Sequence, residues 1–275
     1  MEALHFSAGS VASMIIEGAL MMLIPIVLLI IWEIKTKYNV IPVIVGAATW
    51  FLFAIILKIA PAYLLLQANN PVAKAISGNV WLAYLVAGIL AGVFEETGRF
   101  LAFKFVLRKF KDRRTSISYG IGHGGFESVY IGFQMISLAV VCILISSPFA
   151  SLITAGMDEA SASLLVTQLQ PYSELSFGMC MLGVFERLPA ITLHISLSVL
   201  VFAAAREKRF IYLYPAAILL HTLIDFSIAF TQSGIVPAWA FELIFAFMCA
   251  LIAVPAVFIY KKLKTEEKKE EIVTQ

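Results

Sequence analysis

Long apolar stretches alternate with short polar connections along most of the chain. Seven stretches are long enough to cross the roughly 30 Å hydrocarbon core of a bilayer, which takes about 20 helical residues. Backbone in hydrocarbon must satisfy its own hydrogen bonds, so the pattern predicts an all-α fold, a polytopic transmembrane helix bundle. The predicted spans run approximately 11–32, 40–60, 80–103, 117–147, 178–205, 211–231 and 236–260. We expect the long fourth span to be tilted or broken at its glycine-rich start, Gly120 to Gly125.

Composition agrees with this pattern. Hydrophobic residues make up 61% of the 275-residue chain and charged residues 14%, whereas a soluble domain is nearer half apolar and a quarter charged. The three cysteines (Cys142, Cys180 and Cys249) lack metal-binding spacing and are expected to be small buried apolar residues. The net charge of +2 gives no indication of a nucleic-acid partner, and none is expected.

The domain organisation is predicted to be simple. No internal repeat is visible, so residues 1–260 are expected to form a single transmembrane domain, followed by a charged cytoplasmic tail, 261–275. The tail mixes Lys and Glu, which is typical of a solvated helix extension or a disordered end. Residues 1–10 contain no basic segment, so we expect the first span to be retained and not cleaved as a signal peptide.

Basic residues gather on one set of connections. The opposite set holds only Lys74, with Lys58 at the outer end of the second span. Cytoplasmic loops of membrane proteins are enriched in Lys and Arg. We therefore expect a multi-pass protein of the bacterial cytoplasmic membrane, with its N-terminus outside and its C-terminus inside. The basic connections hold Lys35, Lys37, Arg108, Lys109, Lys111, Arg113, Arg114, Arg206, Lys208, Arg209 and the tail from Lys261.

Four consecutive spans each carry an ionisable residue at a similar depth. These residues stand eight to twelve positions from the nearest cytoplasmic basic residue, which corresponds to about 12–18 Å along a helix. Ionisable groups in hydrocarbon are costly and usually functional. Their shared depth predicts one site, built from Glu96, His123, His194 and His221.

The third span also places a cation beside two carboxylates. Glu95 and Arg99 are four residues apart and Glu96 and Arg99 three apart, so both glutamates can contact the guanidinium on the helix surface. Arg99 can then neutralise one glutamate while the other faces a cavity.

Two further carboxylates follow histidines by one helical turn. His123 precedes Glu127, and His221 precedes Asp225, by four residues. A carboxylate held against an imidazole fixes its tautomer and strengthens its basic nitrogen. By contrast, Glu17, Glu242 and the Glu186–Arg187 pair lie near the outer interface and are expected to be structural.

Paired carboxylates and imidazoles inside a bilayer suit three kinds of chemistry. They can activate water by general acid–base catalysis, carry protons or cations, or hold a divalent metal such as zinc. A four-ligand shell is available from His123, His194, His221 and Glu96. No cofactor is required by the sequence, and HExxH and GxSxG motifs are absent from it.

Three short motifs resemble those of the CAAX-protease and bacteriocin-processing (CPBP) intramembrane proteases. They are Glu95-Glu96-Thr97-Gly98-Arg99, Tyr119-Gly-Ile-Gly-His123 and His221-Thr-Leu-Ile-Asp225. The chain is most similar to the YhfC group of membrane peptidases, which in turn resembles the PrsW proteases. The first motif has two residues between the glutamates and the arginine, where CPBP proteases have three, and Tyr119 stands where they usually have Phe.

The resemblance implies an intramembrane endopeptidase acting on a membrane-anchored protein or peptide substrate. It implies that Glu96, or Glu95 if the helix is rotated, activates water, and that Arg99 orients the pair. It also implies that His123 and His221 stabilise the oxyanion or position the water. Glu127 and Asp225 would orient these imidazoles, and His194 would complete the cavity. The family has been interpreted both as metal-dependent and as a glutamic protease, and we favour the latter because no two histidines share a helix at ligand spacing.

Two alternatives stay open at this point. A proton- or cation-coupled transporter would use the same residues but would need a polar path to both faces. A membrane scaffold or immunity-type binding protein would carry the motifs without activity. The sequence indicates neither a substrate nor an oligomeric state, and the lipid bilayer is the one partner that the composition requires.

Overall fold

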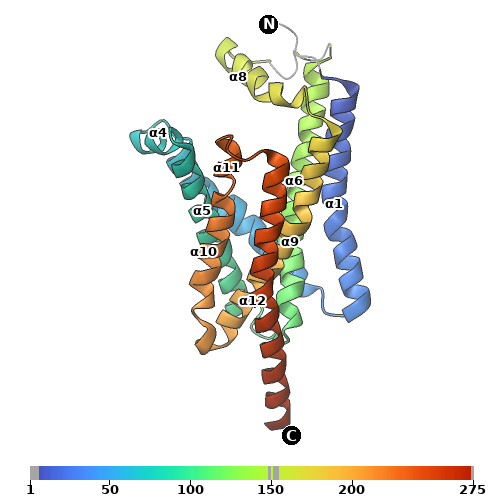
Figure 1. The fold of residues 1–275 in the computed structure, drawn as a ribbon, viewed down its shortest axis with the longest axis vertical. Helices are drawn as coiled ribbons and strands as arrows, with labels where there is room; N and C mark the ends of the chain where they lie inside the picture. The colour runs from blue at the N-terminus through green and yellow to red at the C-terminus, as the bar shows by residue number, and fades with distance from the viewer. Residues whose placement is uncertain (1–5, 148–149, 151–154, 274–275) are drawn as a thin grey trace. The chain divides into compact units, whose positions relative to one another are not determined.

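The computed structural model describes residues 6–147, 150 and 155–273, with side chains as far as Leu263. Throughout these residues the regular elements are helices, and no strand occurs among them (Figure 1). Seven helical segments are long and apolar enough to cross a membrane, which confirms the predicted multi-pass architecture. They are Ala8–Thr36, Ile41–Leu66, Val80–Val106, Arg114–Ile145, Phe177–Arg206, Lys208–Gln232 and Ala238–Leu263.

Four of the seven spans are single α-helices: α1 (Ala8–Thr36), α6 (Arg114–Ile145), α9 (Phe177–Arg206) and α12 (Ala238–Val273). α12 continues past its membrane-length segment into the charged tail, so the backbone of the tail is helical as far as Val273. Among the described residues, three short helices lie outside the spans: α4 (Pro71–Ser77), α8 (Glu159–Leu169) and the 3-10 turn η3 (Gln170–Tyr172).

The other three spans are composite. The second is built from α2 (Ile41–Trp50), the π-helix η1 (Phe51–Leu57) and α3 (Lys58–Leu66). The third joins α5 (Val80–Leu101) to a second π-helical segment, η2 (Ala102–Val106). The sixth contains η4 (Lys208–Phe210), α10 (Leu213–Phe226) and α11 (Ala229–Gln232). π-helical segments are uncommon and are often found at functional sites.

The chain forms two compact units whose boundaries fall inside α1, α6 and α9. The first unit comprises Met1–Ile24 and Ser128–Arg187, and the second comprises Pro25–Glu127 and Leu188–Gln275. In the first unit, α1 and α6 pack closely at Gly18 and Gly132, where a Cβ on either glycine would overlap the other's backbone. All eight predicted site residues belong to the second unit.

Within the second unit, α5 and α10 lie side by side (Figure 1). Their contact is formed by Gly88 and Gly92 of α5, one turn apart, against Thr222 of α10. A Cβ on Gly92 would stand 2.6 Å from the Thr222 hydroxyl, and one on Gly88 would stand 2.7 Å from its carbonyl oxygen. Small residues at this spacing let two membrane helices approach closely.

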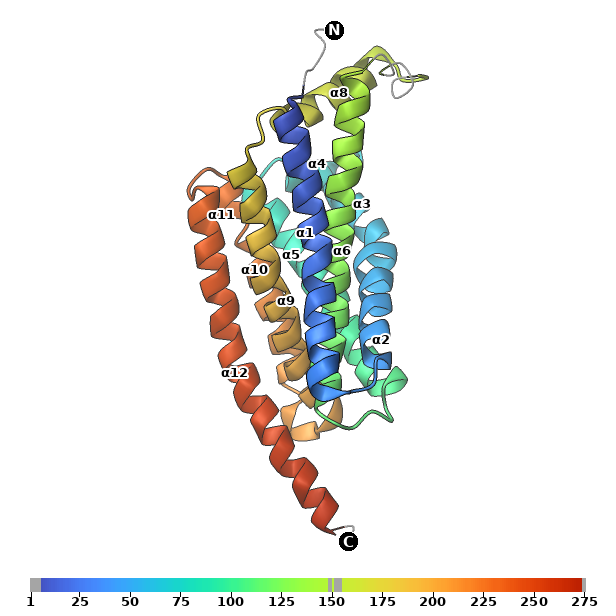
Figure 2. The ribbon, with the colours of Figure 1, turned by 90° about the vertical axis from the view of Figure 1, so that its right-hand side faces the viewer.

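Of the two expectations for the glycine-rich start of α6, tilted or broken, the structure excludes a break. α6 is continuous from Arg114 to Ile145, and its glycines serve close packing. A Cβ on Gly122 would overlap the Val43 carbonyl of α2, which lies beside α6 in Figure 2. A Cβ on Gly124 would stand 2.9 Å from Cβ of His194 in α9. The neighbouring helices occupy the space that glycine leaves, so the helix does not need to open.

Candidate active site

α5 contributes an internally neutralised pair to the site. The Glu96 and Arg99 side chains are fully buried, and Nη1 of Arg99 lies 3.2 Å from Oε2 of Glu96. Arg99 also reaches α9, where Nη1 donates to the His194 carbonyl oxygen at 3.3 Å and Nη2 lies 3.2 Å from His194 Nδ1. Because a guanidinium only donates, Nδ1 of His194 is the acceptor in this contact. Arg99 therefore links α5 to α9.

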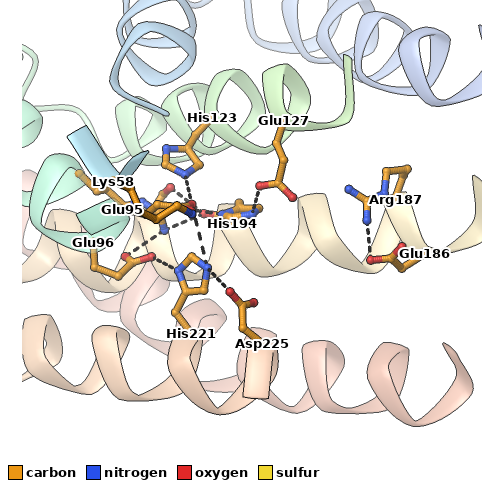
Figure 3. Close-up of polar contacts among 12 residues, drawn as sticks. Lys58, Glu95, Glu96, His123, Glu127, Glu186, Arg187, His194, His221 and Asp225 are labelled. Atoms are coloured by element: carbon orange, nitrogen blue, oxygen red, sulfur yellow. Dashed lines mark hydrogen bonds and ion pairs between the residues drawn. The ribbon is translucent and has the colours of Figure 1, made fainter. Parts of the chain in front are cut away.

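His221 of α10 is held by the same pair. Its Nδ1 lies 2.8 Å from Oε1 of Glu96, and its Nε2 points toward the centre of the cluster (Figure 3). That nitrogen is 4.0 Å from Oε2 of Glu95 and 3.8 Å from Oδ2 of Asp225. A carboxylate on one ring nitrogen fixes the orientation of the other, so Glu96 and Arg99 together orient His221.

His123 of α6 takes Glu95 as its carboxylate partner, with Nε2 3.2 Å from Oε2. Glu127, which we expected to orient His123 within α6, instead lies with Oε2 2.8 Å from Nε2 of His194. His123 and Glu127 share one face of α6, but their side chains contact different helices, His123 reaching α5 and Glu127 reaching α9. The expected pairing of His221 with Asp225 is present, as an ion pair at 3.8 Å.

The three imidazoles lie together at the centre of the second unit. The ring centroids of His123 and His194 are 4.9 Å apart, and those of His194 and His221 are 5.5 Å apart. All three rings are almost inaccessible to solvent. Four helices thus bring the residues of similar predicted depth into one cluster, with Glu95 close to both His123 and His221 (Figure 3).

Lys58 also belongs to the cluster, although the sequence analysis placed it at the outer end of a span. Its Nζ lies 3.4 Å from Oε1 of Glu95, and 25% of its side chain is exposed, against 5% for Glu95. It is the first residue after the π-helix η1. The available signal was a single cation within an apolar run, since such residues usually face the interior of a bundle.

Glu95, His123 and His194 could together hold a metal ion. Each offers one ligand atom, these atoms lie within 4.8 Å of one another, and all three residues are buried. This set differs from the predicted shell, which contained Glu96 and His221. Those two side chains bind each other, and Glu96 also binds Arg99.

The chemistry of the donor set fits a divalent transition metal. Two imidazoles and one carboxylate form the ligand set of several catalytic zinc sites, which leave a fourth position open. In addition, Nδ1 of His123 is buried without a hydrogen-bond partner among the described residues. A buried polar atom of this kind is expected where a ligand binds.

The charges of the cluster also favour a cation. Four carboxylates gather around the imidazoles, whereas Arg99 and Lys58 are the two permanent cations in contact with them. Buried carboxylates need compensating charge, and a divalent ion would supply it. The four are Glu95, Glu96, Glu127 and Asp225.

The polar residues expected to be structural near the outer interface are found partly in the first unit. Glu17 of α1 and Arg187 of α9 are buried there, and Arg187 forms an ion pair with Glu186. Glu17 packs directly on the backbone of Gly183. Their structural role stays a prediction.

The fold and the cluster define a polytopic membrane protein with a buried centre of glutamates and histidines. A family model described as "YhfC intramembrane metalloprotease" matches residues 20–246, and the chain belongs to this family. The chain is 34% identical over 249 residues to the "Uncharacterized membrane protein YhfC" of Bacillus subtilis (strain 168), covering 89% of this chain and 94% of the relative. No solved structure matches the chain.

Family membership confirms the resemblance found in the sequence and makes the chain a membrane protease in the general sense. It favours this function over the transporter and scaffold alternatives. The family description also favours metal dependence over the metal-independent mechanism that we preferred from the sequence.

Proposed function

We propose that this protein is a metal-dependent endopeptidase that hydrolyses peptide bonds of membrane-embedded or membrane-anchored substrates. The observation that carries the proposal is the convergence of Glu95, His123 and His194, from three helices, with ligand atoms within 4.8 Å of one another. A divalent ion held there, such as zinc, would polarise the scissile carbonyl and make bound water more acidic.

In this proposal Glu127 accepts the proton of the attacking water. Its carboxylate lies against His194, one of the three ligands, and 19% of its side chain is exposed, so water can reach it. As the water oxygen bonds to the carbonyl carbon, Glu127 takes the proton and then delivers it to the leaving amine nitrogen when the C–N bond breaks. This differs from the expectation that Glu96 or Glu95 is the base.

Glu96 and Arg99 act as positioning residues. Glu96 binds both Arg99 and Nδ1 of His221, which leaves its carboxylate engaged on both sides. The Nε2 of His221 then faces the centre of the cluster, where the protonated imidazole can donate to the oxyanion of the tetrahedral intermediate. Asp225 and Glu95, near the same nitrogen, stabilise that protonated form.

Two variants separate metal binding from proton transfer. His123→Ala removes a ligand, so we expect loss of both bound metal and cleavage. Glu127→Gln keeps the metal but lowers cleavage by about 10²–10⁴-fold, the usual contribution of a general base. Metal content is measured by elemental analysis of the purified protein. Cleavage is measured as new N-termini in membranes of cells that produce each variant.

Glu186→Gln, on an ion pair of the first unit, serves as the control and should retain both metal and cleavage. Undiminished metal content in folded His123→Ala would show that these residues are not the metal site. Undiminished cleavage in Glu127→Gln would remove Glu127 as the base and leave the metal site standing.

A further inference from the structure

An apolar cavity lies in the second unit between α6, α9 and α12. Its volume is about 210 Å³, and it is partly open. Its lining is almost entirely hydrocarbon, and it extends over about 10 Å of α12, from Ala253 to Tyr260. The main apolar residues around it are Ile117, Ile195, Val199, Ala253, Val257 and Tyr260.

The cavity is on the opposite face of α9 from the histidine cluster. Thr192, Ser196 and Val199 form one stripe of the helix that lines the cavity, while His194, between them in sequence, faces the cluster. The two hydroxyls donate to carbonyl oxygens of their own helix, Thr192 to Leu188 at 2.9 Å and Ser196 to Thr192 at 2.7 Å. With these donors engaged within α9, the cavity suits a hydrocarbon ligand.

One end of the cavity is bordered by cations. The guanidinium of Arg113 stacks on the ring of Tyr260, 4.1 Å from its centroid, and its Nη1 donates to the Tyr260 carbonyl oxygen at 3.0 Å. The next two residues of α12, Lys261 and Lys262, are exposed. An apolar cavity that ends at a basic edge matches the two parts of an anionic lipid, because basic residues at a membrane surface attract anionic headgroups.

The geometry points to a binding site for an anionic phospholipid, with one acyl chain in the cavity and its phosphate at Arg113 and Lys261. The size of the cavity favours an acyl chain over a peptide helix as its occupant. A helix about 10 Å across would fill on the order of 800 Å³ per 10 Å of length, which is more than the cavity can hold. The site does not depend on the proposed protease function.

The test uses the full chain, purified in a neutral detergent and titrated with phosphatidylglycerol or with phosphatidylcholine of the same acyl chains. Bound lipid is counted by native mass spectrometry, and thermal stability is followed in parallel. We expect phosphatidylglycerol to bind at least fivefold more tightly. Ala253→Trp, which fills the cavity, should abolish specific binding, whereas Ala250→Trp, on an exposed part of the same helix outside the cavity, should not.

The charge is tested with Arg113→Gln, which should weaken phosphatidylglycerol binding about fivefold, and Arg113→Lys, which should retain most of it. Arg108→Gln, on an exposed basic residue away from the cavity, is the control. Equal binding of both lipids would overturn the anionic preference. Unchanged lipid binding in Ala253→Trp would overturn the site.

Discussion

Glu95 contacts three different cluster residues through its two carboxylate oxygens. Oε1 binds Lys58, and Oε2 binds His123 and lies near His221. A carboxylate with a cation on one oxygen and imidazoles on the other can exchange partners when a metal arrives. In the proposed metal-bound state, the charge of Lys58 would change from a stabilising partner of Glu95 to a repulsive neighbour of the metal.

We therefore expect Lys58→Met to raise the affinity for a divalent ion by roughly three- to tenfold, because it removes a positive charge near the metal. Lys58→Arg should bind like the native protein. Titration of the purified, metal-free protein with Co²⁺, followed by visible absorption, measures the dissociation constant. Lys74→Met, outside the cluster, is the control, and an unchanged or weaker affinity in Lys58→Met would contradict the repulsion argument.

How far this site could be predicted differs from residue to residue. The grouping of Glu96, His123, His194 and His221 follows from counting residues to the basic ends of the spans, because helical rise is constant. The contact of Glu127 with His194 could not be predicted, since it depends on how two helices are rotated about their axes. Sequence patterns predict the depth of a residue in the membrane well, but they predict the rotation of a helix about its axis poorly.

At the scale of elements, the contact of α5 with α10 brings the glutamates to His221. Gly88 and Gly92 lie two turns and one turn, respectively, before Glu95 and Glu96, and both face the backbone of α10. The separation of these two helices therefore determines the distance between Glu96 and His221, although neither glycine belongs to the cluster.

Gly92→Ile should abolish cleavage by forcing α5 and α10 apart, while leaving every cluster residue unchanged. The added side chain would meet the Thr222 hydroxyl and the Ile218 carbonyl, neither of which can withdraw easily. Activity is compared with Gly178→Ile, where a Cβ meets only a distant serine hydroxyl. Native activity in Gly92→Ile would show that the helix contact does not control the site.

The overall class of the molecule was predictable because each span is read from a long window of apolar residues. All seven predicted spans have a counterpart in the structure, with ends that differ by several residues. The division of the spans into α-helical and π-helical segments was not predictable. Nothing in the run Phe51–Leu57 distinguishes a π-helix from an α-helix, because the difference is one hydrogen-bond register and not a change in polarity.

The orientation in the membrane stays a prediction from charge at the scale of the whole molecule. An odd number of spans places the two ends on opposite sides, and the basic connections predict that the C-terminus is cytoplasmic. A fluorescent protein fused after Gln275 should therefore fluoresce, and a periplasmic alkaline phosphatase fused there should be inactive. The reverse pattern would contradict the predicted topology.

The π-helix η1 has a consequence for how the second span could be altered. A π turn contains one more residue than an α turn, so the segment accommodates one extra residue while the residues after it keep the angular phase of a helix that is one residue shorter. Deleting Ile55 should remove that residue and restore α-helical winding, with Lys58 kept close to its present angular position around the helix axis. The shortened protein should then bind Co²⁺ as the native protein does, with Lys58 still directed toward Glu95.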